Sequence, residues 1–292
     1  LFSLLSACAG SPPTSDHAMA EDVLRDTDRD VLFAAEFPVA NKAEAIARAE
    51  TARQSGEIDK ALFFYVKALK FDPKDADLLA AIGRLHQYQG NAELAVRAYS
   101  MALEVRPDDA MLLEARGLIL LKHDEAERAF DDLNNAVAIN ANAWQAYNGL
   151  GLLANERGNH SEAIAHYDTA LRINPDAGPV LNNRGYAKML AYDYIGARTD
   201  LSRAARDLGY RQAWMNLGAL YGKLGLFDQA VDAYSEVLPA PDALNKTAEA
   251  SMRDGDYATA QTLLKKAILL SPTYFPEAEE NLLEAQAKLG QR

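Results

Sequence analysis

Small residues recur along this chain at a fixed spacing. Five alanines each lie 34 residues from the next, and two more continue the series at slightly shorter steps: Ala61, Ala95, Ala129, Ala163, Ala197, Ala230 and Ala260. A fixed period of this length is the sequence signature of a repeat protein, in which each small unit buries its apolar face against its neighbours. The period therefore predicts a stack of similar units rather than one globular core.

Three further landmarks keep a constant distance from each alanine. A small residue lies twelve positions before it: Ala49, Gly83, Gly117, Gly151, Gly185, Gly218 and Ala248. A large residue lies four positions after it: Tyr65, Tyr99, Leu133, Tyr167, Leu201, Tyr234 and Leu264. Several units end near a proline: Pro73, Pro107, Pro175 and Pro272. Because proline cannot continue a helix, these prolines predict where a unit ends.

Each unit is predicted to contain two antiparallel helices. Apolar positions follow i, i+3, i+4 spacing, and the alternation typical of strands is missing. Glycines that tolerate positive φ mark the turn between the helices: Gly56, Gly90, Gly158, Gly225 and Gly255. We expect the small residue to admit the backbone of the second helix, and the large residue to wedge against the next unit. Asp124 and Tyr192 replace the turn glycine in the third and fifth units. The sequence therefore does not predict the backbone geometry of these two turns.

The second and fourth units resemble the tetratricopeptide repeat (TPR). Both ADLLAAIGRLHQYQGNAELAVRAYSMALEVRP and WQAYNGLGLLANERGNHSEAIAHYDTALRINP carry its landmarks in order. The resemblance implies an all-α fold, a right-handed α-solenoid of about seven TPR helix hairpins with a C-terminal capping helix. We place the repeats at 42–75, 76–109, 110–143, 144–177, 178–210, 211–240 and 241–274, with an N-terminal helical cap at 21–41 and the C-terminal capping helix at 275–292.

Composition and motifs argue against several classes of function. The formal net charge of −12 disfavours nucleic acid and bare anionic membrane as binding partners. A single cysteine rules out an intramolecular disulfide framework and a cysteine-cluster metal site. The five histidines are scattered, and no HExxH, GxSxG or Walker sequence occurs. We therefore predict no enzymatic activity, no cofactor and no metal site.

The single cysteine lies near the start of the chain, in LFSLLSACAGSPPTS. Leu5-Ser6-Ala7-Cys8 matches the bacterial lipobox, in which a signal peptidase cuts before the cysteine and the thiol then carries diacylglycerol. We interpret residues 1–7 as the remnant of a lipoprotein signal peptide, and residues 8–20 as the lipidated Cys8 followed by a flexible tether. Two or three acyl chains hold a protein stably on a membrane, whereas one chain does so only marginally. Ala9, in place of aspartate, favours the outer membrane.

The first helix of each repeat is expected to line a concave surface that can bind a partner. Positions opposite the small residue supply the candidate groove residues Arg84, Gln87, Asn148, Asn182, Asn183, Tyr186, Asn216, Lys223 and Lys246. Asparagine offers both a donor and an acceptor, which suits the backbone of an extended peptide whatever its side chains. Similar asparagines contact peptides in several TPR domains, so the resemblance supports this interpretation. Alternatively, these asparagines are ordinary solvent-exposed residues without a binding role.

Two longer segments narrow the resemblance. Together with the lipobox and the repeats, LNNRGYAKMLAYDYIGARTDLSRA and LLKKAILLSPTYFPEAEENL resemble the TadD family, the TPR lipoproteins of the tight-adherence (Flp) pilus machinery. The resemblance implies a non-catalytic scaffold, anchored in the outer membrane and facing the periplasm, whose protein partner is a secretin or another pilus assembly component. Two alternatives stay open: a periplasmic adaptor lipoprotein for cell-envelope enzymes, and a cytosolic peptide-binding TPR protein if Cys8 carries no lipid.

Overall fold

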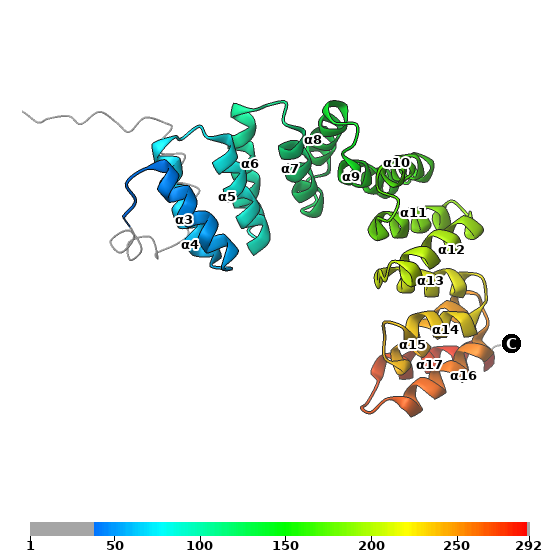
Figure 1. Ribbon diagram of the computed structural model, residues 1–292. Helices are drawn as coiled ribbons and strands as arrows, with labels where there is room; N and C mark the ends of the chain where they lie inside the picture. Colours follow the sequence, from blue (N-terminus) through cyan, green and yellow to red (C-terminus); the bar gives the residue numbers. More distant parts are fainter. Residues whose placement is uncertain (1–37, 291–292) are drawn as a thin grey trace, which may run out of the picture. The chain divides into compact units, whose positions relative to one another are not determined.

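The computed structural model describes residues 38–290, and every regular element within them is a helix (Figure 1). These residues belong to two compact units, one ending at Ala146 and the other beginning at Tyr147. The predicted signal-peptide remnant, the tether with Cys8, and residues 21–37 of the predicted N-terminal cap lie outside the described residues. No helix within residues 38–290 has both the length and the apolar composition needed to span a bilayer.

In the first compact unit, consecutive helices pack as hairpins (Figure 1). They are α3 (Lys42–Gln54), α4 (Ile58–Phe71), α5 (Ala76–Gln89), α6 (Ala92–Val105), α7 (Ala110–Lys122) and α8 (Ala126–Ile139). Helices α4 and α6 also contact the first helix of the following hairpin. Each hairpin therefore covers the apolar face of its neighbour, as a repeat protein requires.

The second compact unit continues the same pattern. Helix α9 (Trp144–Glu156) begins before the boundary and extends into this unit. It is followed by α10 (His160–Ile173), α11 (Gly178–Leu190), α12 (Tyr194–Ser202), the π-helix η1 (Arg203–Asp207), α13 (Gln212–Lys223), α14 (Phe227–Ser235), α15 (Ala240–Arg253), α16 (Tyr257–Leu270) and α17 (Pro276–Gly290). The two units confirm the predicted all-α class and the consecutive helix hairpins of a TPR solenoid.

Polar side chains fix where the first helix of each of the first three repeats begins. Asn41, Asp75 and Asp109 are the N-caps of α3, α5 and α7. Each side-chain oxygen accepts hydrogen bonds from backbone N–H groups two or three residues further on, at 2.9–3.2 Å. These bonds satisfy N–H groups that a helix start leaves without an intrahelical partner.

A residue in the left-handed region closes the turn between the two helices of every repeat. The predicted turn glycines have φ between 71° and 80°: Gly56, Gly90, Gly158, Gly225 and Gly255. Asp124 and Tyr192 take the same conformation, with φ of 61° and 64°. The third and fifth repeats therefore keep the common turn without glycine, although a side chain in this region costs about 1–2 kcal/mol.

The small residue of the first helix lies against the large residue of the second helix in the same repeat. A Cβ built on Gly151 would lie 2.5 Å from the Tyr167 ring, and one on Gly185 would lie 2.7 Å from Leu201. The second, third and sixth repeats show the same arrangement. We expected the glycine to admit a helix backbone and the large residue to wedge against the next repeat. The space that the glycine leaves is filled by a side chain of its own repeat, and at Gly185 the backbone of the second helix is also close, with Ala197 O 3.2 Å from the same Cβ position.

The third and fifth repeats each hold an ion pair between their two helices in which the aspartate is buried and the arginine is partly buried. Arg116 donates from Nε and Nη2 to the two carboxylate oxygens of Asp132, both at 2.7 Å, and from Nη1 to Ser100 Oγ at 2.9 Å. Arg184 binds Asp200 through the same fork, at 2.7 and 2.6 Å. Such bidentate charge-assisted bonds are stronger and more directional than neutral ones. These two repeats thus add a charge pair to the apolar contacts that join their helices.

His86 on α5 is a buried base without a hydrogen bond at one ring nitrogen. The residue is 7% exposed, and its Nδ1 has no hydrogen-bond partner among the described residues. Burial lowers the pKa of the His86 ring, because the protonated form would lose its hydration. The folded chain therefore keeps this ring neutral at a pH where the unfolded chain protonates it.

Lowering the pH from about 7.5 to about 5.5 should destabilise the protein through His86. The unfolded ring takes up a proton near a pKa of about 6.5. Since the folded pKa is lower, the unfolded state binds more protons in this window, and stability falls with pH by at most about 1.4 kcal/mol per unit for one group. Urea midpoints across this range should fall less steeply in His86→Phe. Equal slopes in the wild type and in His86→Phe would contradict the explanation.

Candidate functional site: an asparagine ladder

Four asparagines on the first helices of three successive repeats form one chain of hydrogen bonds. Asn183 Nδ2 donates to Asn148 Oδ1 at 3.0 Å, and Asn216 Nδ2 donates to Asn182 Oδ1 at 2.8 Å. Within α11, Asn182 Nδ2 donates to Asn183 Oδ1 at 3.2 Å. We call these four residues the asparagine ladder. It joins α9, α11 and α13 in the second compact unit, so the structure brings together all four asparagines that the sequence predicted.

The ladder follows directly from the repeat. Asn148, Asn182 and Asn216 lie 34 residues apart, and residues one period apart occupy equivalent positions on their helices. Asn182, in the middle, is 5% exposed, whereas Asn148, Asn183 and Asn216 are half-buried. A buried amide needs hydrogen-bond partners, and Asn182 finds them in its neighbours. The centre of the ladder is therefore structural, and its other members reach solvent.

The ladder keeps hydrogen-bonding capacity for a ligand. A side-chain amide has two N–H donors and an oxygen that can accept twice. The bonds among the four asparagines use one N–H each from Asn182, Asn183 and Asn216. The half-buried members can thus still donate to, or accept from, the backbone of a chain laid across the three helices.

Three other predicted residues lie on first helices of the second compact unit. Tyr186 follows the ladder by one turn of α11 and is 38% exposed. Lys223 ends α13, and its Nζ lies 5.8 Å from the centre of the Tyr192 ring. Lys246 is half-buried on α15. Tyr186 extends the face of α11 that carries the ladder, because residues four apart on a helix lie on one side.

Arg84 and Gln87 belong to α5 in the first compact unit. Both are exposed, and Gln87 Oε1 accepts a hydrogen bond from the Tyr99 hydroxyl at 3.1 Å. Burial raises the pKa of Tyr99, so its hydroxyl stays a donor at neutral pH. Gln87 therefore holds a tyrosine of its own repeat, a role that the sequence pattern did not predict.

Two polar contacts of the first helices were not predicted from the sequence. Asn281 Nδ2 on α17 donates to Asn245 Oδ1 on α15 at 3.0 Å, and Asn245 is 2% exposed. In the first compact unit, Glu114 Oε1 accepts from the backbone N–H of Ala146 at 2.8 Å, at the start of α9. Burial raises the pKa of Glu114 against the lowering effect of this bond. The sequence did contain a signal for Asn245: it is the fifth residue of its repeat, the position that Asn182 occupies in the fifth repeat.

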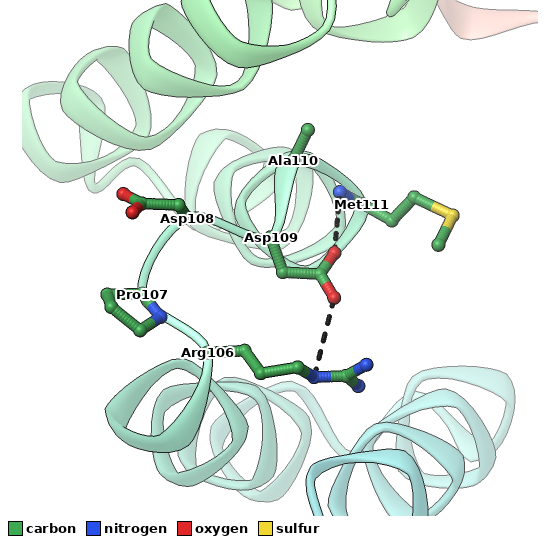
Figure 2. Close-up of a pocket in the computed structure, with 6 residues that line it drawn as sticks. All are labelled: Arg106, Pro107, Asp108, Asp109, Ala110 and Met111. Atoms are coloured by element: carbon green, nitrogen blue, oxygen red, sulfur yellow. Dashed lines mark hydrogen bonds and ion pairs between the residues drawn. The ribbon is translucent and has the colours of Figure 1, made fainter.

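A hollow of about 550 Å³ in the first compact unit is formed by the turn between α6 and α7 (Figure 2). Figure 2 shows Asp109 accepting from the backbone N–H of Met111, at 3.0 Å, and facing Arg106 Nε, at 3.6 Å. Arg106 Nη2 also donates to Asp77 at 2.8 Å. These polar groups serve the start of α7, so we do not assign a ligand to the hollow. Residues 38–290 also contain no group of three His, Cys, Asp or Glu side chains arranged to hold a metal ion.

The repeats are tetratricopeptide repeats. Models of this family match residues 46–75, 80–143, 144–177 and 212–238, together just over half of the chain. The chain therefore belongs to the tetratricopeptide-repeat family. Proteins with this fold are typically non-catalytic scaffolds that bind other proteins. Comparison with curated proteins gave no match.

Solved structures share this fold at low sequence identity. A tetratricopeptide repeat protein from Parabacteroides merdae matches with a TM-score of 0.61 and 18% identity, over 84% of this chain and 98% of that one. Pseudomonas aeruginosa pilF matches with a TM-score of 0.51 and 20% identity, over 85% and 97%. A MamA protein matches with a TM-score of 0.52 and 24% identity, over 56% and 90%. At these identities the likeness shows the fold alone.

Proposed function

We propose that this chain is a non-catalytic scaffold that binds an extended segment of a partner protein along the asparagine ladder. The ladder carries the proposal, since it places amides of three successive repeats in one row and leaves part of their hydrogen-bonding capacity open. The backbone of an extended peptide alternates N–H and C=O groups, and side-chain amides can pair with both. Exposed Tyr186 beside the ladder offers an apolar contact to the same segment.

We further propose that the scaffold works at the outer membrane, lipidated at Cys8 and facing the periplasm, in assembly of the Flp pilus. The lipobox around Cys8 supports the location, and the resemblance to the TadD family supports the machinery. The partner would then be the secretin or another pilus assembly component. The likeness to pilF adds nothing to this argument beyond the fold.

Cross-linking in cells tests the binding surface. A photoreactive phenylalanine analogue at position 186 should capture the partner, whereas the same analogue at Leu269, which is 82% exposed on α16, should not. Replacing the ladder ends, Asn148→Ala with Asn216→Ala, should reduce the adduct roughly tenfold, because several backbone hydrogen bonds of about 1 kcal/mol each are lost. This variant leaves the bond between Asn182 and Asn183 within α11.

The matched control is Asn281→Ala, which removes the other amide pair of the second compact unit. It should leave the adduct unchanged. An adduct that survives loss of the ladder ends, with both variants folded by circular dichroism, would contradict binding at the ladder. Mass spectrometry of the adduct identifies the partner class: a secretin or pilus component supports the pilus proposal, and a cell-envelope hydrolase supports the adaptor alternative.

Metabolic labelling with a palmitate analogue tests the location. The wild-type chain should be labelled and should sediment with the outer membrane, while Cys8→Ser should remain unlabelled. A wild-type chain that carries no label would contradict both lipoprotein interpretations and would favour the cytosolic peptide-binding alternative.

A further inference from the structure

Four exposed apolar side chains lie at the turns between the two helices of the fifth and sixth repeats. Tyr192 and Ile195 are both 75% exposed, and Leu224 and Leu226 are both 39% exposed. The two turns adjoin, because Nζ of Lys223 lies 5.8 Å from the centre of the Tyr192 ring. We call Tyr192, Ile195, Leu224 and Leu226 the apolar turn edge.

Tyr192 occupies a position at which the backbone favours glycine. Its φ is 64°, where five other repeats have glycine and the third has Asp124. Aspartate enters this left-handed region more readily than most residues, whereas a bulky aromatic residue there is an outlier. Burial of the ring does not offset the strain, because the side chain is exposed. Strained residues of this kind cluster at functional sites, so the exposed ring indicates a role in binding.

Ile195 departs from the other repeats in a second way. It lies in the first turn of α12, which carries no acidic residue. Four other repeats have a carboxylate at the equivalent position, where the helix dipole favours it: Asp59, Glu93, Glu127 and Asp228. The fifth repeat therefore has an exposed β-branched apolar side chain in place of a favourable charge.

The turn of the sixth repeat departs from the pattern at two positions. Leu226 is the N-cap of α14 and makes no capping hydrogen bond. The N-caps of the other second helices are all polar: Glu57, Asn91, Glu125, Asn159, Asp193 and Asp256. Leu224 likewise stands where other repeats have alanine or a polar residue. Local preferences that are broken together at one place, without a gain in packing, mark a functional surface.

The chemistry of the apolar turn edge fits the interfacial region of a lipid bilayer. A standard protein interface uses about 20–30 residues on each side, which is far more than two turns supply. Tyrosine rings and lysine side chains are typical of membrane–water interfaces, where the ring lies at headgroup level and the ammonium group stays in water. Lys223 beside the Tyr192 ring provides this combination. Asp193 and Asp228 lie in the same two segments of the chain, so binding should not depend on anionic lipid.

We propose that the apolar turn edge inserts into the interfacial region of the membrane that holds Cys8. The inference rests on the proposed function, because the lipid on Cys8 supplies the main anchor. A few exposed side chains bind a bilayer weakly by themselves, but an anchor on the same chain makes their contact intramolecular and raises their effective concentration. Residues 8–37 can span at most about 100 Å, which lets an edge of the second compact unit reach the same bilayer. The contact would orient the asparagine ladder relative to the membrane surface.

A fluorescent probe on the lipidated full chain tests this contact. The chain has one cysteine, and lipidation converts its thiol to a thioether, so Ile195→Cys supplies the thiol for a nitrobenzoxadiazole label. The labelled protein is reconstituted at low density into phosphatidylcholine vesicles, in which part of the lipid carries a nitroxide quencher. We expect the emission of the label at position 195 to shift to the blue and to be quenched by the nitroxide lipid.

Ser161→Cys is the matched control, because it places the same label at the equivalent, exposed position of the fourth repeat. It should show neither the shift nor the quenching. Equal quenching at positions 161 and 195 would overturn the proposal, since the lipid anchor alone would then account for it.

A second variant removes the apolar turn edge without weakening the fold. Tyr192→Gly with Leu226→Asp introduces the residues that other repeats use at these two positions. It should reduce quenching of the label at position 195 to the level of the Ser161→Cys control. It should also raise the urea midpoint, because it relieves the backbone strain and adds an N-cap. Loss of quenching therefore could not be attributed to misfolding.

Three other outcomes would overturn the inference. Quenching at position 195 that survives in the Tyr192→Gly, Leu226→Asp variant would show that other residues make the membrane contact. A blue shift without nitroxide quenching would show that the edge contacts a second copy of the chain. A chain that is labelled with palmitate but is neither shifted nor quenched at position 195 would overturn the inference and leave the proposed function intact, whereas a chain without palmitate would overturn both this inference and the proposed location.

Discussion

Replacing Arg116 with methionine should lower the free energy of unfolding by about 3–5 kcal/mol, because a buried ion pair that loses one partner leaves an uncompensated charge. The Asp132 side chain is 8% exposed, and Arg116 supplies bonds to both of its oxygens at 2.7 Å. Methionine keeps the apolar stem of the side chain but provides no counter-charge. Urea unfolding followed by circular dichroism at neutral pH measures the loss.

The second repeat provides a natural control for this prediction. One period before Arg116 and Asp132 it carries Ile82 and Ala98, both buried. A double variant, Arg116→Ile with Asp132→Ala, copies this apolar solution, and replacing a buried pair in full is often close to neutral. We expect it to recover most of the stability that Arg116→Met loses. A double variant as unstable as the single one would contradict the charge explanation.

The fifth repeat gives a second comparison. Arg184→Met removes the same fork from Asp200, but Lys188 Nζ still lies 2.8 Å from that carboxylate. The loss should therefore be smaller than for Arg116→Met. Equal losses in the two repeats would contradict the expectation that Lys188 compensates the charge of Asp200.

The repeat architecture could be predicted from the sequence because its signals are local. Glycine at Gly90 or Gly158 and proline at Pro107 act on their own backbone, whatever the surrounding structure. The conformation of Tyr192 could not be predicted from such local signals. Nothing in a tyrosine predicts φ of 64°, and its conformation is imposed by the hairpin that the rest of the repeat forms. Tertiary structure here overrides the preference of the residue.

The contacts between helices could be predicted only in part. The period places Asn148, Asn182 and Asn216 on one face, but the hydrogen bonds between them depend on how closely successive helices approach. Arg116 and Asp132 lie on two different helices, and no spacing in the sequence marks them as partners. Their pairing requires the fold, since side chains sixteen residues apart meet only when the hairpin closes. The apolar turn edge likewise requires the fold, because Tyr192 and Lys223 belong to different repeats.

Replacing Tyr167 with alanine should lower the free energy of unfolding by about 3–5 kcal/mol, as for other large buried aromatic residues. The side chain is 1% exposed and packs over Gly151, where a Cβ would lie 2.5 Å from the ring. Truncation therefore leaves a cavity between α9 and α10. Burial also raises the pKa of Tyr167, so the loss should not change with pH across the neutral range.

Two controls show whether the fit between Tyr167 and Gly151 determines this loss. Tyr88→Ala removes the same atoms from a residue that is 78% exposed, and should change stability by no more than about 0.5 kcal/mol. Tyr167→Leu recreates the pair of glycine and leucine that the third and fifth repeats use, and should retain much of the stability that alanine loses. If leucine and alanine proved equally destabilising, the space above the glycine would be specific to a tyrosine ring. A glycine of the first helix would then tolerate leucine opposite it only where the charge pairs of Arg116 and Arg184 also join the two helices.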